Sequence, residues 1–102
     1  MDTLSTSYPQ AAKETVTLDF PVMFNNTEIT ALSIRRPRVK DQMIADKQNK
    51  DNTDKEIHLM ALLAEVEREL IQELDMSDYE QVQKVIVGFR QKKSQSEPSK
   101  ED

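Results

Sequence analysis

The chain of 102 residues contains no cysteine, one glycine (Gly88) and one histidine (His58). Without cysteine it can form neither a disulfide nor a cysteine-based metal site. With one glycine it cannot build the glycine-rich loops that bind dinucleotides or the phosphates of a P-loop. His58 has no second histidine three or four residues away, so a helical zinc site lacks ligands and a surface position is expected. No serine stands beside an activating base. We therefore expect no metal, no cofactor and no enzymatic activity.

Long apolar runs are also lacking: none approaches the ~18 residues that a membrane span needs. The N-terminus shows no charged-then-apolar signal pattern. The formal net charge is −5, with both signs interspersed. The one basic cluster is short and consists of Arg35, Arg36, Arg38 and Lys40. We expect these side chains to be solvated, at the end of a strand and the start of a helix. These features predict a soluble cytoplasmic protein that binds neither membranes nor nucleic acids.

Both ends of the chain have little to bury. Residues 1–12 are rich in serine and threonine, and residues 91–102 contain no apolar residue except Pro98. We expect two disordered tails around one small domain at residues 13–90. A domain of this size buries only about 60–65% of its surface, and binding to another molecule often stabilises such domains.

Two alternating runs, at residues 14–20 and 28–35, predict β-strands. Asn25 and Asn26 between them tolerate the positive φ of a tight turn. The side chains expected on the inner faces of this hairpin are Val16, Leu18, Phe20, Thr30, Leu32 and Ile34. Because a lone hairpin is not stable in water, helices must cover that face.

Helical periodicity follows Pro37, and the spacing predicts helices at residues 38–48, 54–74 and 78–90. Thr53 with Glu56, and Ser77 with Glu80, have capping-box spacing at two of the starts. The predicted fold class is therefore α+β, with a small N-terminal β-hairpin followed by about three α-helices. We expect Pro37 to fix the strand-to-helix turn, and Arg35 or Arg36 to pair with an acidic group on a helix. The alternative is that both arginines are solvated.

The predicted central helix at 54–74 is apolar over about half of its circumference, wider than one core face needs. It is either packed on two sides or leaves a groove for a partner. The candidate partner-binding residues are Leu59, Met60, Leu63, Val66, Leu70, Ile71 and Leu74. If the helix leaves a groove, part of this row stays accessible to an amphipathic helix of a partner. The same surface could instead pair two copies of the chain as a homo-oligomer.

Four stretches between Glu14 and Phe89 together resemble one protein family. They read E-T-V-T-L-D-F-P, L-S-I-R-R-P-R-V-K-D, L-D-M-S-D-Y-E-Q-V-Q and V-G-F. In this order they resemble the tail assembly chaperones of Mu-like and related contractile-tailed phages. Family members tend to carry a Thr-Gly-Leu-Ser-Pro-like break before the third stretch. Since residues 64–68 of this chain have neither glycine nor proline, a continuous or only slightly kinked helix is predicted there.

The resemblance implies a function that composition does not show. It implies binding to the tape measure protein, protection of that protein's apolar helices from aggregation, and help for tail tube subunits during assembly. It also implies absence from the finished virion. Two hypotheses compete with this one: a minor structural tail or virion accessory protein, and a regulatory adaptor.

Overall fold

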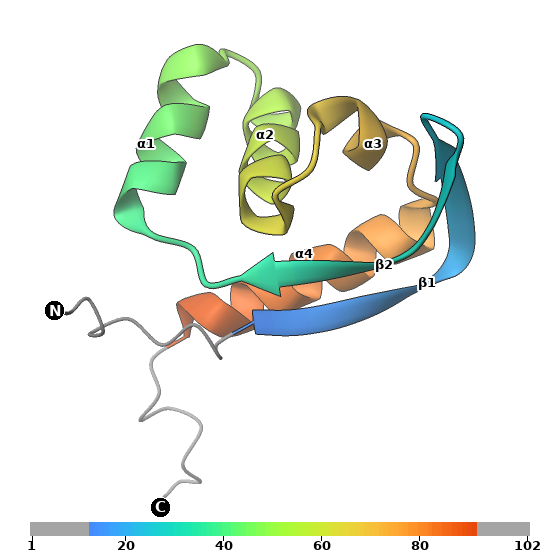
Figure 1. Ribbon diagram of the computed structural model, residues 1–102. Coiled ribbons are helices and arrows are strands. Elements are labelled where there is room, and N and C mark those ends of the chain that lie inside the picture. The colour runs from blue at the N-terminus through green and yellow to red at the C-terminus, as the bar shows by residue number, and fades with distance from the viewer. Residues whose placement is uncertain (1–12, 92–102) are drawn as a thin grey trace, which may run out of the picture.

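The computed structural model describes residues 13–91, and Figure 1 shows the arrangement of their elements. They form an antiparallel hairpin followed by four helices, in the order β1 (Lys13–Phe24), β2 (Thr27–Arg35), α1 (Val39–Gln48), α2 (Asn52–Ala64), α3 (Arg68–Gln72) and α4 (Met76–Arg90). The curved hairpin lies along α4, and α1, α2 and α3 follow one another on the same side of the hairpin. The α+β class is confirmed, with one helix more than predicted. The predicted tails at 1–12 and 91–102 lie outside the described residues, except for Gln91.

The hairpin turns where predicted, with Asn25 and Asn26 at φ values of 50° and 64°. Its register is irregular: Thr17 pairs with Ala31 but Val22 pairs with Ile29, so residues 18–21 of β1 oppose a single residue of β2. An irregularity of this kind locally rotates a strand.

Four of the six predicted inner-face residues are buried, namely Val16, Leu18, Leu32 and Ile34. The prediction was wrong for Phe20, which is 57% exposed, and for Thr30, which is also exposed. Both lie at the irregularity, where strict alternation fails. Beyond it, Ile29 packs against the core in place of Thr30.

Asp78, in the first turn of α4, stabilises the irregular stretch of β1. Its side chain is fully buried, and its carboxylate accepts hydrogen bonds from the backbone N–H groups of Asp19 (2.9 Å) and Phe20 (3.0 Å). Strand residues that leave the ladder need another partner for their N–H groups. A residue 59 positions along the chain supplies that partner, so hairpin and α4 depend on each other.

The central helix is broken, so the predicted continuous helix at 54–74 was wrong. Helix α2 ends at Glu65, which has left-handed backbone angles (φ 59°, ψ 44°), and α3 begins at Arg68. The N–H of Val66 reaches back to the carbonyl of Ala61, which completes the end of α2. Leu70 and Ile71 of α3 are thereby buried against the core. Their burial offsets the unfavourable left-handed conformation of a non-glycine residue.

Two helices begin earlier than the capping boxes predicted. The N-caps are Asp51 for α2 and Asp75 for α4. The Asp51 carboxylate accepts from the backbone N–H groups of Thr53 and Asp54, and the Asp75 carboxylate accepts from that of Ser77. Asp75 also accepts a bond from the hydroxyl of Ser77 at 2.7 Å, and this bond lowers the pKa of Asp75. Aspartate is among the best N-cap residues, so it takes the position from the residue two places later.

The core lies between the hairpin and the helices. Its largest fully buried apolar side chains are Ile34, Met60, Leu63, Ile71 and Val82. Each element except α1, which contributes Ala45, supplies at least two residues to it. No helix within residues 13–91 is long and apolar enough to span a membrane.

Candidate functional site

The joint between β2 and α1 is held by an ion pair in which the Asp41 side chain is 3% exposed and the Arg35 side chain 26% exposed. Both terminal nitrogens of Arg35 donate to the two oxygens of Asp41 at 2.9 Å, and the N–H of Arg38 donates to the same carboxylate at 2.9 Å. Asp41 is buried, and the bond from Arg35 holds the pKa of its carboxyl below the ordinary value. The prediction that Arg35 or Arg36 pairs with an acid on a helix is confirmed for Arg35.

Arg36 has a different role from Arg35. Its guanidinium donates to the carbonyl oxygen of Phe89 at 3.0 Å and lies 5.3 Å from the centre of the Phe89 ring. It therefore binds one of the last carbonyls of α4, where a cation is favoured. The Arg-Arg-Pro and Gly-Phe stretches, far apart in the sequence, meet at this contact.

His58 was expected on the surface but is partly buried. Its Nδ1 lies 2.8 Å from the side-chain amide nitrogen of Asn49, which also donates to the carbonyl of Ala45. Burial, with a smaller effect of Arg68, lowers the pKa of His58. The contacts join α1, α2 and α3, and this role is structural. Within residues 13–91 no group of three potential metal ligands occurs.

The predicted partner-binding row is mostly core in this conformation. Val66 is half-buried, while the other six are buried: Leu59, Met60, Leu63, Leu70, Ile71 and Leu74. The break at Glu65 folds α3 back, so that both sides of the row are packed. Binding of a partner by this row stays a prediction.

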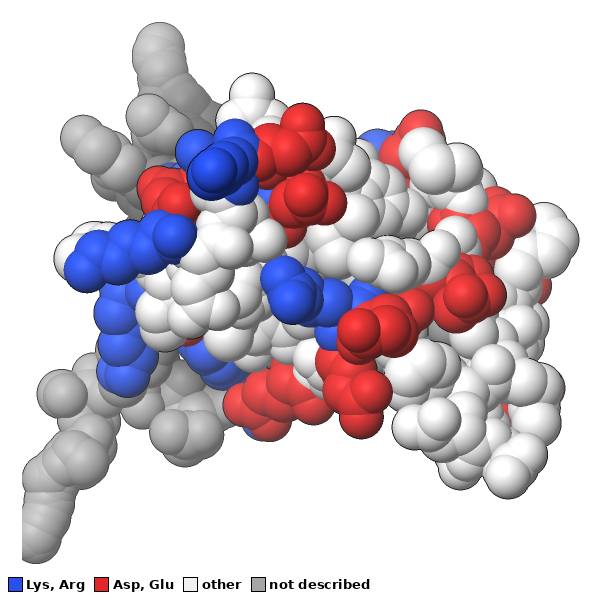
Figure 2. Space-filling view, turned by 90° about the horizontal axis from the view of Figure 1, so that it is seen from above, with Lys and Arg blue, Asp and Glu red and all other residues white. Residues whose placement is uncertain are grey.

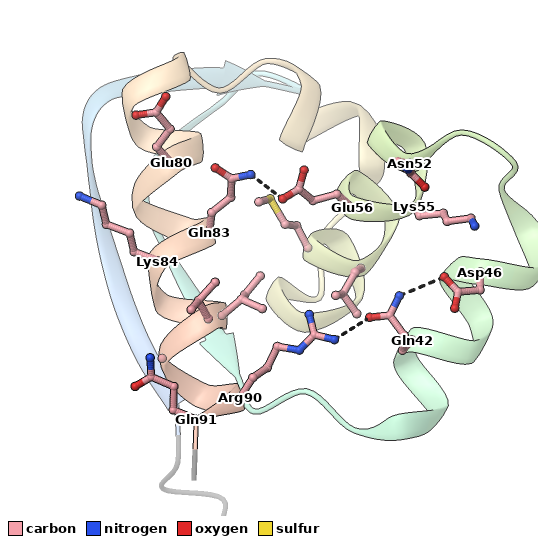
Figure 3. A pocket seen from close by; sticks show the side chains of 15 residues that line it. Gln42, Asp46, Asn52, Lys55, Glu56, Glu80, Gln83, Lys84, Arg90 and Gln91 are labelled. Atoms are coloured by element: carbon pink, nitrogen blue, oxygen red, sulfur yellow. Dashed lines mark hydrogen bonds between the residues drawn. The ribbon is translucent and has the colours of Figure 1, made fainter. Parts of the chain in front are cut away.

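Leu59 and Met60 also border a groove of 910 Å³ between α4 on one side and α1 and α2 on the other (Figure 3). Together with Ile86 they supply its apolar floor. Val87, on the α4 side, is 55% exposed. The groove thus offers a partner an apolar centre made by two helices.

Polar side chains bridge the groove at both ends (Figure 3). At one end Glu56 accepts hydrogen bonds from Gln83 and from the Tyr79 hydroxyl, the latter at 2.8 Å. Burial and the neighbouring Glu56 raise the pKa of Tyr79, so the hydroxyl stays protonated and donates. At the other end Arg90 donates to Gln42 at 3.3 Å, a long bond between exposed atoms.

Gly88 lines the same groove, in a helical backbone with no positive φ. A Cβ atom built at this position would meet no described atom within 4 Å. Neither turn geometry nor packing among the described residues therefore requires glycine here. A lone glycine near the end of an apolar helix weakens that helix or admits a close neighbour.

Basic side chains on the face shown in Figure 2 lie mainly toward the end of the molecule where β1 begins and α4 ends. Acidic side chains alternate with them and extend over the rest of that face. Such a mixed pattern differs from the clustered lysines and arginines that a phosphate backbone binds.

A family model described as "Phage tail assembly chaperone proteins, E, or 41 or 14" matches residues 15–91. Neither a curated protein nor a solved structure is significantly similar to the chain. The match begins in β1 and runs past the last residue of α4, so it covers nearly the whole described fold and well over half of the 102 residues. The chain therefore belongs to the family of phage tail assembly chaperone proteins.

Proposed function

We propose that this chaperone binds the tape measure protein in the cytoplasm of the host cell. It keeps the apolar helices of that client soluble while tail tube subunits assemble around them, and it leaves before the virion is complete. The family match over residues 15–91 carries the proposal, because it assigns a role in tail assembly to the whole fold. A role of this kind needs protein partners and no catalytic group.

The exposed apolar side chains support a holding function. They occur on β1, α1 and α4, and three of the six are methionines: Met23, Met43 and Met76, beside Phe20, Val39 and Val87. Methionine is flexible and polarisable, so it adapts to client helices of different sequence.

The predicted row from Leu59 to Leu74 remains part of the proposal in a reduced form. Leu59 and Met60 border the groove, where they are only 5% and 1% exposed and offer a client a small apolar area in the described conformation. The members on and beside α3 are covered, and they can contact a client only after α3 moves away from the core.

Co-expression tests the proposal directly. The tape measure gene of the same phage is expressed with and without this protein, and the soluble fraction is measured by sedimentation and affinity co-purification. We expect the tape measure protein to become soluble and to co-purify. A tape measure protein that stays equally insoluble with and without this protein would contradict the proposal.

The alternative, a minor structural tail component, makes a different prediction about the finished particle. Mass spectrometry of purified virions should find tail tube and tape measure peptides but none from this chain. Its presence at a fixed stoichiometry would favour the structural role and overturn the chaperone proposal.

A further inference from the structure

We propose that the groove between α4 and α1–α2 is the client site, and that it receives one amphipathic helix whose backbone crosses α4 at Gly88. This inference rests on the proposed function and adds the place and chemistry of the contact. Three independent features of the groove support it: an unneeded glycine, an apolar centre, and walls of opposite charge.

Gly88 is the first feature. Glycine inside a helix is less favourable than alanine, yet no described atom fills the space above it. In helix pairs that pack closely, a residue without a side chain lets the two backbones approach. A helix laid across α4 at this point would use the open space that the fold itself leaves empty.

The apolar centre is the second feature. Val87 is exposed on the α4 side of Gly88, and Leu59, Met60 and Ile86 form the floor. Polar bridges close off both ends, so the apolar part is limited to the middle of the groove. A partner with aliphatic side chains at i, i+3, i+4 and i+7 matches this shape, because those positions form one stripe.

The two walls are the third feature. On the α4 side lie Lys84 and Arg90, with one acid, Glu80. On the α1–α2 side lie Asp46 and Glu56, with one base, Lys55. The helix that fits therefore carries acidic residues along the edge facing α4 and basic residues along the edge facing α1 and α2.

Entry of the helix requires one contact to open. The Arg90–Gln42 bond crosses the groove at the exposed end and is long, at 3.3 Å. Because both side chains are flexible and reach solvent, the bond can exchange for contacts with the client at little cost. Arg90 is then free to meet the acidic edge.

Three synthetic 18-residue peptides test the inference by fluorescence anisotropy. All share one leucine stripe; the first has glutamates along one edge and lysines along the other, the second lysines on both edges, and the third glutamates on both. The full-length protein should bind the first peptide most tightly. Gly88→Leu should weaken that binding by about tenfold or more, because the side chain fills the crossing point. Gly88→Ala should have a smaller effect.

Gln81→Leu is the matched control, since it adds the same side chain to an exposed position of α4 outside the groove. It should bind the first peptide as the wild type does. Gly88→Leu should keep the wild-type circular dichroism spectrum, because a Cβ atom at this position meets open space. Equal binding by folded Gly88→Leu and wild type would overturn the inference, and so would equal binding of the three peptides.

Two further outcomes separate the groove from its alternatives. If sedimentation shows a wild-type dimer that Gly88→Leu dissociates, the groove is an interface between two copies and the inference is wrong. If Gly88→Leu still makes the tape measure protein soluble as the wild type does, the groove inference fails but the proposed function stands. If the wild-type protein itself does not make the tape measure protein soluble, the proposed function fails.

Discussion

Two regions of the molecule, the β2–α1 joint and the groove, are built from similar residues but in opposite ways. At the joint Asp41 is buried and Arg35 is half-buried, and the Asp41 carboxylate receives three bonds of 2.9 Å from Arg35 and from the backbone of Arg38. At the open end of the groove Arg90 is exposed, Gln42 is half-buried, and the two share one bond of 3.3 Å. The first arrangement is suited to a fixed geometry, and the second can rearrange.

Helix α4 takes part in both regions through different faces. Asp78 and the Phe89 carbonyl hold the hairpin and the joint, while Val87 and Gly88 face the groove. Substitutions on the face of α4 that holds the hairpin and the joint should therefore alter the stability of the fold. Substitutions on the face that lines the groove should alter binding of the client.

The largest effect is expected at Asp78. Asp78→Ala leaves the N–H groups of Asp19 and Phe20 without their acceptor, and it should lower the free energy of unfolding by roughly 3–5 kcal/mol. Urea unfolding followed by circular dichroism measures this. Asp78→Asn keeps one carbonyl oxygen and should lose less. A loss below about 1 kcal/mol for Asp78→Ala would show that water replaces the carboxylate.

Asp41→Asn should come next, with a loss of about 2–4 kcal/mol at neutral pH. It removes the buried carboxylate charge of a pair whose arginine is half-buried, and it leaves Arg35 only partly compensated. The folded pKa of Asp41 lies below its ordinary value of 3.8. Its contribution is thus present above that value and is lost as the pH falls through the folded pKa.

Stability of the wild type should consequently decrease below about pH 4, and Asp41→Asn should show a shallower decrease. Asp75, whose pKa is also lowered, adds to the decrease in both proteins. Urea midpoints at several pH values measure the difference. Parallel pH profiles would contradict an ionised Asp41 as a stabilising group.

Arg36→Ala should reduce stability by about 1–2 kcal/mol, since it removes one charged hydrogen bond and one cation–π contact. Arg36→Lys keeps the charge but not the planar group, and an intermediate loss is expected. Unchanged melting temperature in both variants would show that the end of α4 does not need this contact.

The smallest effect, and the only gain, is expected at Glu65. Glu65→Gly relieves the left-handed conformation by roughly 1 kcal/mol. It also removes an exposed ion pair with Arg35 at 3.7 Å, which contributes little. A slightly raised melting temperature would support the break as a feature of the folded protein. A lowered one would favour a helix that continues through Glu65.

The hairpin and the helix positions could be predicted because their signals are local. Alternation around Val16 and Leu32, the Asn25–Asn26 turn and the stripe of α4 lie within short windows. The irregularity after Thr17 could not be predicted, because it depends on hydrogen bonds to Asp78, a residue that is distant in sequence. The predicted N-caps, Thr53 and Ser77, were wrong by two residues. In each case an aspartate two positions earlier, Asp51 or Asp75, caps the first turn instead.

The break at Glu65 carries no glycine or proline, so composition predicted a continuous helix. Tertiary packing favours the break, because α3 folds back on the core and Leu70 and Ile71 are buried there. The family resemblance had pointed to a break here. Of the groove, only Leu59 and Met60 were among the predicted partner-binding residues, since its walls come from three helices that meet in the fold.

The most direct test of the account is a map of the client contact by amide chemical shifts. The full-length protein, labelled with ¹⁵N, is titrated with the peptide that has one acidic and one basic edge. We predict that the shifts change in α4 from Gln83 to Gln91 and on the facing sides of α1 and α2, with little change in α3 or at the hairpin turn. Changes centred on Val66 to Leu74 instead would contradict the groove and would place the client on the row that α3 covers.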